Sequence, residues 1–169
     1  GDPRLEDMQK KMNLKIKNRE SFRPFAPAIL DGFQQQYFKL NQESQYMLIT
    51  RKLDDAFLLE VNEDNSNLGL KKVNQIRSTL PAITHIDNSC RVQTVKKQRN
   101  PKFYDLINEF YKLTGCPVLI NTSFNVRGEP IVCTPEDAFR CFVFTNIDYL
   151  VLGSFLIDKT DISNEIKNK

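Results

Sequence analysis

The sequence predicts a mixed α/β (α+β) fold in which helices flank an open, twisted mixed sheet. Short apolar segments of strand length are interleaved along the chain with two clearly amphipathic helical segments. Several strand-turn-strand steps occur between them, which favours a mixed sheet over a strictly parallel one. The length of 169 residues, with 40% hydrophobic and 27% charged residues, is typical of one globular domain that can bury its own core.

Charge and cysteine use exclude several classes of protein. The net charge of +3 is too small to indicate general nucleic-acid binding. No apolar run approaches the ~20 residues of a membrane span, and the N-terminus Gly1-Asp2-Pro3-Arg4 lacks the features of a signal peptide. The four cysteines contain no CxxC pair, and His85, the single histidine, is not spaced with them as in a zinc site. We therefore expect buried, reduced thiols in a cytoplasmic protein, and no metal held by the chain.

The first half of the chain predicts strands separated by short helices and turns. Pro24 and Pro27 exclude a helix between residues 22 and 28. Residues 52–79 carry the weakest pattern, and their polar cluster at 62–67 indicates a surface loop. The predicted elements are a charged helix over 1–13, a strand over 26–30, a short helix over 33–40, a strand over 46–51, and two strands over 80–86 and 91–95 joined by the turn Asp87-Asn88-Ser89.

The second half contains the two clearest helices. Asn100, Pro101 and Gly115 supply the N-cap, the first residue and the C-terminal stop of one helix. Thr134 and Pro135, followed by two acidic residues, open the other. The apolar stripe of the first helix comprises Phe103, Leu106, Ile107, Phe110 and Tyr111. The predicted elements are a helix over 101–114, a strand over 117–120, a helix over 134–144, a final strand over 149–157 and a frayed tail over 159–169.

Four cations follow one another closely after the first helix. They are Lys15, Lys17, Arg19 and Arg23. If the segment is extended, all four lie on one side of it, because they occupy odd positions. Such a strip suits phosphate or carboxylate, since Arg gives bidentate contacts and Lys a point charge. The alternative is a solvent-facing edge strand whose lysines discourage aggregation.

Two further polar clusters interrupt the apolar pattern. In the first, His85 and Asp87 would share one sheet face, with Arg91 and Gln93 sharing a face across the turn. A His, a carboxylate and an Arg at strand ends can bind and polarise a small anion, although a lone His is also commonly structural. The second cluster is Asn121-Thr122-Ser123-Phe124-Asn125, directly after a buried strand, where α/β sheets usually bind ligands. The same residues can instead satisfy their own backbone in an Asx or ST turn.

These clusters lie in three long blocks that resemble one known family. The blocks are N-L-K-I-K-N-R-E-S-F-R-P-F-A-P at 13–27, L-P-A-I-T-H-I-D-N-S-C-R-V-Q-T-V at 80–95 and P-V-L-I-N-T-S-F-N-V-R-G-E-P-I-V-C-T at 117–134. They resemble, in this order, blocks in the C-terminal, YrdC-like domain of the NodU/CmcH-type carbamoyltransferases. The resemblance runs from Asp2 to about Lys159. It implies a junction with an N-terminal domain at 1–13, a YrdC-like domain at 14–159 and a polar tail at 160–169.

The resemblance implies an ATP-dependent O-carbamoyltransferase. In the family this domain takes carbamoyl phosphate and ATP, with Mg²⁺, and forms carbamoyl adenylate and pyrophosphate. An N-terminal domain of actin-like fold, outside this sequence, then transfers the carbamoyl group to an acceptor hydroxyl. By resemblance, the carbamoyl phosphate and the reacting phosphate would be held by Lys17, Arg19, Arg23, His85, Asp87 and Arg91, with Lys15 beside them. The ATP contacts would come from Asn121, Ser123 and Asn125.

One departure and two alternatives accompany this interpretation. The family's Asp-Gly-Thr stands here as Asp87-Asn88-Ser89, and Asn tolerates a left-handed turn nearly as Gly does. A different hypothesis is a nucleotide- or RNA-binding module without turnover, with Lys96-Lys97-Gln98-Arg99 touching phosphate; as a simple charge run, it would be a solvated loop. A third is a degenerate domain that only completes an interface with the N-terminal partner.

Overall fold

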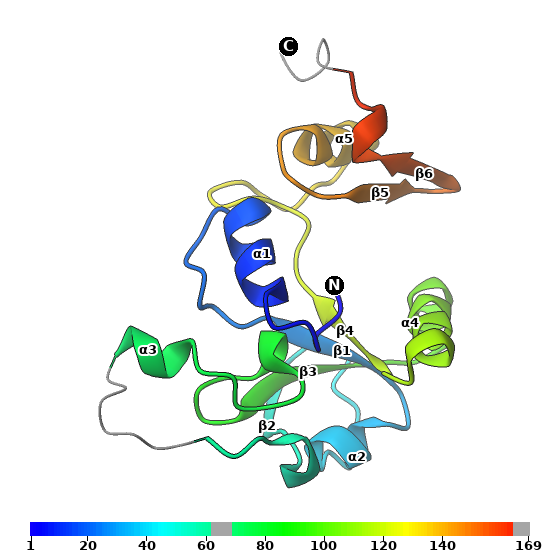
Figure 1. The fold of residues 1–169 in the computed structure, drawn as a ribbon. Coiled ribbons are helices and arrows are strands. Elements are labelled where there is room, and N and C mark those ends of the chain that lie inside the picture. The colour runs from blue at the N-terminus through cyan, green and yellow to red at the C-terminus, as the bar shows by residue number, and fades with distance from the viewer. Residues whose placement is uncertain (62–68, 164–169) are drawn as a thin grey trace. The chain divides into compact units, whose positions relative to one another are not determined.

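A computed structural model describes residues 1–61 and 69–163 (Figure 1). The chain forms two compact units: the first comprises residues 1–9 and 22–122, and the second comprises residues 10–21 and the chain from residue 123 onward. The strands are β1 (Ala26–Leu30), β2 (Ile49–Lys52), β3 (Ser89–Val95), β4 (Val118–Asn121), β5 (Tyr149–Leu152) and β6 (Phe155–Asp158). The helices are α1 (Met8–Lys15), α2 (Gln34–Phe38), α3 (Leu70–Val73), α4 (Pro101–Thr114) and α5 (Pro135–Val143), with 3₁₀ helices at Asp55–Phe57, Pro81–Ile83 and Lys159–Asp161.

The first unit is built on a four-stranded mixed sheet, which confirms the predicted fold class. The strand order is β2-β3-β1-β4. The central strands β1 and β3 are parallel, whereas β4 pairs with β1 and β2 pairs with β3 in the antiparallel sense. Both central strands are almost entirely buried, as expected for strands covered on two faces.

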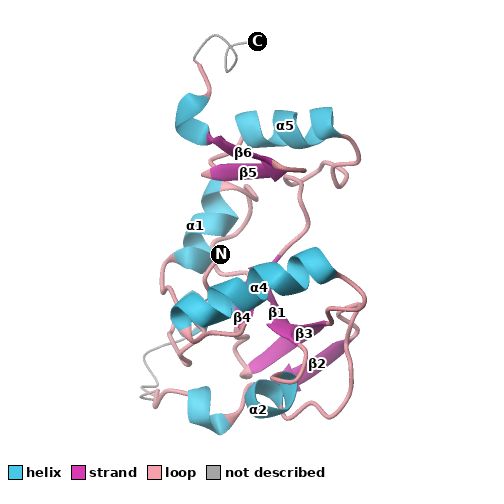
Figure 2. Cartoon of the chain, turned by 90° about the vertical axis from the view of Figure 1, so that its right-hand side faces the viewer, coloured by secondary structure: helices cyan, strands magenta, loops and turns pink. Residues whose placement is uncertain are grey.

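The register of this sheet decides which side chains share a face. Ala26 lies opposite Asn121, and Ala28 lies opposite Gln93. Ala26 and Ala28 point to the same face of the sheet, because side chains two residues apart in a strand do so. Their partners Asn121 and Gln93 therefore also point to that face, on the two strands that flank β1. At its other end the same face is covered by α4, which buries Ile107 completely (Figure 2).

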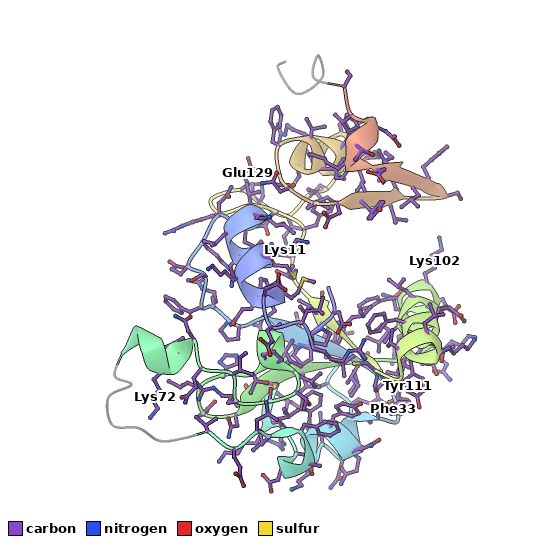
Figure 3. All side chains as sticks on the ribbon, viewed as in Figure 1. Lys11, Phe33, Lys72, Lys102, Tyr111 and Glu129 are labelled. Atoms are coloured by element: carbon purple, nitrogen blue, oxygen red, sulfur yellow. The ribbon has the colours of Figure 1, made fainter. Side chains whose placement is uncertain are left out.

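The helix α4 begins and ends where the sequence predicts. The Asn100 side chain accepts a hydrogen bond from the Phe103 amide at 3.2 Å, and Gly115 terminates the helix with a φ of 72°. The ring of Phe33 meets Tyr111 of α4 edge-on, with 4.8 Å between centroids (Figure 3). The predicted stripe is too wide, however: Leu106 is 59% exposed, while its neighbour Ile107 is fully buried.

The second unit has a core of its own between α5 and the hairpin of β5 and β6. The Thr134 hydroxyl and the Asp137 carboxylate form a reciprocal capping box at the start of α5. This confirms the predicted helix start. Buried Phe142 of α5 packs in one cluster with Leu150 of β5. The single strand predicted over 149–157 is wrong: Gly153, with a φ of 62°, reverses the chain and divides the segment into two antiparallel strands.

Other segments depart from the predicted elements in ways that local chemistry explains. Residues 80–86 do not form a strand; Pro81 opens a short 3₁₀ helix there instead. The helix predicted over 1–13 spans Met8–Lys15. The surface loop predicted at 62–67 lies outside the described residues. Among the described residues, no helix combines the length and apolarity that crossing a membrane requires.

Candidate functional site

A buried lysine organises the polar loop that follows β4. Lys17 is only 4% exposed, and its Nζ donates to the Asn125 side-chain oxygen at 2.8 Å, the Asn125 carbonyl at 2.9 Å and the Ser123 hydroxyl at 3.2 Å. It also contacts the Ser123 carbonyl. We call Lys17, Ser123 and Asn125 the lysine cluster; all three belong to the second unit.

The geometry of the lysine cluster depends on the loop around Asn125. The Ser123 hydroxyl lies 2.6 Å from the Asn125 side-chain oxygen. The Asn125 amide nitrogen donates to the Glu129 carbonyl at 2.9 Å, so the amide oxygen faces the lysine. Phe124, between Ser123 and Asn125, packs against the core of this unit. Glu129, at the other end of the loop, is labelled in Figure 3. The polar side chains are therefore held on a loop that is itself anchored.

The segment carrying Lys17 is shaped by Asn13, which is not among the predicted site residues. Asn13 is fully buried at the end of α1, donates to the Ser21 carbonyl at 3.1 Å and accepts from the Arg19 Nε at 2.6 Å. The amides of Ile16 and Lys17 both bond to the Met12 carbonyl. The chain thus turns back on itself after α1. The one sequence feature that could have indicated this turn is the polar Asn13 between the apolar residues Met12 and Leu14.

The predicted extended strip of cations is therefore wrong. Lys15 is the last residue of α1, and Lys17 and Arg19 follow in an irregular loop that includes Asn18 with a φ of 48°. Lys15 is exposed on the helix, whereas Lys17 is buried. Arg23 is exposed and belongs to the first unit, while the other three cations belong to the second. Residues at i and i+2 share a face only in an extended strand, so the odd-numbered spacing does not align these side chains where the backbone is helical or turning.

Among residues 1–61 and 69–163, no carboxylate contacts the ammonium group of the lysine cluster. Within the described chain, the Nζ of Lys17 contacts only neutral oxygens. Burial lowers the pKa of Lys17, and the nearby Arg19 guanidinium lowers it further. A pocket of about 270 Å³ lies in the same unit, with both polar and apolar side chains in its lining: Asn18, Val126, Glu129, Arg140, Cys141, Phe144 and Thr145. An incoming anion would stabilise this buried ammonium.

The second candidate cluster is a tight turn in the first unit, formed by residues 85–89. The His85 amide donates to the Ser89 carbonyl at 2.9 Å, and the Asn88 amide donates to the His85 carbonyl at 2.9 Å. The Asp87 carboxylate accepts from the Ser89 amide at 3.0 Å. The chain turns at residues 86–88, close to the predicted turn Asp87-Asn88-Ser89, but Ser89 is the first residue of β3. His85 and Asp87 precede this strand and do not share a sheet face.

The titratable groups around this turn are the His85 imidazole, the Asp87 carboxylate and the Arg91 guanidinium. Burial lowers the pKa of His85, although the Asp87 carboxylate raises it and Arg91 lowers it. Hydrogen bonds from Ser89 hold the pKa of Asp87 below its usual value. Arg91 is exposed on β3, and its guanidinium has no hydrogen-bond or ion-pair partner among the described residues. An imidazole and an unpaired guanidinium near the exposed turn suit a small oxyanion.

Asn121 and Gln93 form the third cluster. The Asn121 side-chain nitrogen donates to the Gln93 side-chain oxygen at 2.5 Å, and Gln93 in turn donates to the Gln45 carbonyl at 3.0 Å. Arg91 and Gln93 lie on the same face of β3, as predicted. The structure therefore brings Asn121 to the face that carries Arg91, while Ser123 and Asn125, only two and four residues later, belong to the second unit.

The four cysteines and an apolar pocket on α5 lie outside the three polar clusters. Cys90, Cys116 and Cys141 are buried free thiols, as expected, but Cys133 is exposed and departs from that expectation. Burial raises the pKa of Cys90 to about 12, which makes it an inert thiol at neutral pH. A larger apolar pocket, about 490 Å³, lies on α5 and contains none of the predicted site residues.

The basic run at residues 96–99 is largely neutralised. Lys96 pairs with the carboxylates of Glu43 and Asp31, and Lys97 pairs with Asp105 at 3.3 Å. The run forms a turn between β3 and α4, in agreement with the interpretation of the segment as a loop. Because nearby carboxylates occupy its lysines, it offers weak support for a nucleic-acid surface.

Comparison with known proteins connects these clusters to one family. A sequence model described as Carbamoyltransferase C-terminus matches residues 1–159. The chain is 56% identical over 161 residues to the Synechocystis protein sll1178 and 38% identical over 162 residues to nodulation protein NolO of Bradyrhizobium diazoefficiens, covering 95% and 96% of the chain. It is 31% identical over 138 residues, 82% of the chain, to 3'-hydroxymethylcephem-O-carbamoyltransferase of Amycolatopsis lactamdurans.

The chain spans about a quarter of the length of these relatives, 26%, 27% and 22% respectively. The matched region contains the lysine cluster, the turn at 85–89 and Asn121. The resemblance predicted from three sequence blocks is thus confirmed, and the chain belongs to the carbamoyltransferase C-terminal family, in its NodU/CmcH type.

Proposed function

We propose that this chain binds carbamoyl phosphate and ATP and forms carbamoyl adenylate, as part of an O-carbamoyltransferase. The observation that carries the proposal is the buried Lys17 ammonium, which is held only by neutral oxygens of Ser123 and Asn125 in the described chain. Two polyanions bound close together repel each other, and cations offset that repulsion. A lysine without a carboxylate partner keeps its charge available for this purpose.

The turn at 85–89 suits carbamoyl phosphate, while the lysine cluster suits the phosphates of ATP. Arg91 and His85 would hold the phosphate end, with Asp87 fixing the turn. Lys17 would face the polyphosphate, and Ser123 and Asn125 would orient it. Arg19 and Arg23 would add charge, and the exposed Lys15 would contribute at longer range.

The reaction would proceed in two steps. Water attacks the carbamoyl carbon, the bond from that carbon to the phosphate oxygen breaks, and carbamate and inorganic phosphate form. A carbamate oxygen then attacks the α-phosphorus of ATP, the bond to the β-phosphate oxygen breaks, and pyrophosphate leaves. The residues of this chain act by positioning and by charge stabilisation, which suffice for much phosphoryl-transfer catalysis.

Mg²⁺ would enter this site with ATP. Within residues 1–61 and 69–163, no three His, Cys, Asp or Glu side chains gather as they would in a metal cage. Mg²⁺ usually keeps several waters and binds phosphate oxygens of a nucleotide, so the proposal places it on the phosphates of ATP. Transfer of the carbamoyl group to an acceptor hydroxyl would then need an N-terminal domain of actin-like fold, which is our proposal for the partner.

The test is pyrophosphate release from Mg-ATP with and without carbamoyl phosphate, together with calorimetric binding of each ligand. Release that depends on carbamoyl phosphate and falls in Ser123→Ala and Arg23→Ala supports the proposal. Ser154→Ala, an exposed serine in the second unit, is the matched control and should behave as wild type. A folded wild-type chain that binds neither ligand would overturn the proposal.

A further inference from the structure

A buried arginine outside every predicted cluster holds the turn at 85–89. Arg77 is 9% exposed, and its Nη1 donates to the Ile86 carbonyl at 2.9 Å. Its Nη2 donates to the carbonyl of Lys72, which lies in α3 and is labelled in Figure 3. No carboxylate pairs with Arg77 among the described residues, and burial lowers the pKa of the guanidinium. Burying a cation without a counter-charge costs free energy of folding. The contacts of Arg77 therefore indicate a role beyond stabilising the fold.

The backbone on either side of Arg77 is fixed independently of its side chain. The Leu59 amide donates to the Arg77 carbonyl at 2.9 Å, and the Thr79 amide donates to the Phe57 carbonyl at 2.9 Å. These bonds fix the backbone from which the Arg77 side chain extends.

A buried pair of hydroxyls extends this rigidity to the beginning of the turn. The Ser78 and Thr84 hydroxyls lie 2.8 Å apart, and the Thr84 hydroxyl donates to the Leu80 carbonyl at 2.8 Å. These residues are the immediate neighbours of Arg77 and His85 in the chain. The arginine and the histidine are thus attached to the two ends of one stiff segment.

The carbonyl that Arg77 binds belongs to the residue between His85 and Asp87. On its other side the turn is held by the Leu53 amide, which donates to the Asn88 carbonyl at 2.8 Å. The Ile86 side chain is 49% exposed and adds little packing. Without Arg77, the peptide joining the histidine to the aspartate would lose its side-chain anchor. A shift of this peptide would move both groups together.

We propose that Arg77 is a positioning residue, which sets the orientation of His85 and Asp87 for the phosphate of the substrate. This inference rests on the proposed function, because it assigns the turn to an anion. Arg77 acts through the backbone of Ile86 and does not touch the ligand. The charges that act on His85 are those of Asp87 and Arg91, so an effect of Arg77 on the imidazole would be transmitted by geometry.

The single histidine makes the proposal measurable without turnover. In the full chain, the imidazole resonances of His85 are titrated by NMR, and inorganic phosphate and carbamoyl phosphate are titrated at fixed pH. Arg77→Met should move the His85 pKa upward, toward its ordinary value, and weaken carbamoyl phosphate binding about tenfold. Arg77→Lys, which keeps the charge but loses the two-armed contact, should give an intermediate result. Arg51→Met, which removes an exposed arginine of the same unit, is the charge-matched control.

The outcomes separate this inference from the proposed function. If Arg77→Met folds and both the His85 titration and the affinity match wild type, the positioning role is overturned, even where wild type binds carbamoyl phosphate. If wild type binds no carbamoyl phosphate, the substrate role fails with the proposed function, while a shifted His85 pKa in Arg77→Met still establishes control of the turn. Should Arg77→Met fail to fold, Arg77→Lys decides by the same two readings, and wild-type behaviour in both overturns the inference.

Discussion

The Nζ of Lys17 lies 2.8 Å from the side-chain oxygen of Asn125, 108 positions further along the chain. This contact joins two sequence blocks that each contain chemistry-bearing residues. It also holds the lysine in a buried position, where its charge is stabilised by dipoles alone in the described chain. The first prediction concerns what this charge does.

Lys17→Met should remove the charge while retaining an apolar stem of similar length. We expect ATP affinity to fall by at least about tenfold, because a buried cation interacts strongly with phosphate. The free energy of unfolding should change by less than about 2 kcal/mol, since losing the hydrogen bonds is partly offset by losing the desolvation cost of the ammonium. Calorimetry and urea unfolding measure the two effects. The control is Lys10→Met, at an exposed lysine of the same unit; severe unfolding with no specific loss of affinity would indicate a structural lysine.

The stability of the first unit should depend on pH through His85. Its folded-state pKa lies below the ordinary 6.5, chiefly because of burial. Below pH 6.5 the unfolded chain therefore binds more protons at His85 than the folded chain does. The stability that His85 contributes in its neutral form decreases as the pH falls toward the folded pKa. His85→Gln should unfold with a weaker pH dependence between pH 7 and pH 5. Urea unfolding at several pH values checks this; identical slopes for wild type and variant would refute the assignment.

The turn residue Asn88 should tolerate glycine better than alanine. Its φ of 64° lies in the left-handed region, which Gly and Asn enter readily and other residues do not. We expect Asn88→Gly to stay within about 0.5 kcal/mol of wild type, and Asn88→Ala to lose about 1 kcal/mol. Carbamoyl phosphate binding should survive in the glycine variant. Equal stabilities of the two variants would show that the left-handed turn is not a constraint.

Ile107 and Leu106 form a matched pair on α4. Ile107 is fully buried against the sheet, so Ile107→Ala should cost about 2–5 kcal/mol of unfolding free energy in the first unit. Leu106 is 59% exposed, and Leu106→Ala should cost less than about 1 kcal/mol. Urea unfolding followed by circular dichroism, with hydrogen exchange of the α4 amides, makes the comparison. Similar losses at both positions would mean that another surface covers Leu106.

The sequence by itself determined the elements whose causes are local. The helix α4 has its cap, its first-turn proline and its terminal glycine within one short stretch, and α5 has its capping box within four residues. The prolines before and within β1 exclude a helix there, and β1 spans the predicted residues. The blocks that identify the family are also continuous stretches of sequence, which is why the family could be predicted before any contact was known.

Only the tertiary structure decided which side chains meet. The alternation of cations at 15–23 suggested a strip, but the buried Asn13 turns the chain and places Lys17 with Ser123 instead. Nothing near Arg77 in sequence shows that it binds the Ile86 carbonyl. Such contacts depend on burial and on the path of distant segments, because the energy of a buried polar group is set by the partners it finds. The local sequence pattern around a residue does not show which distant residues will contact it.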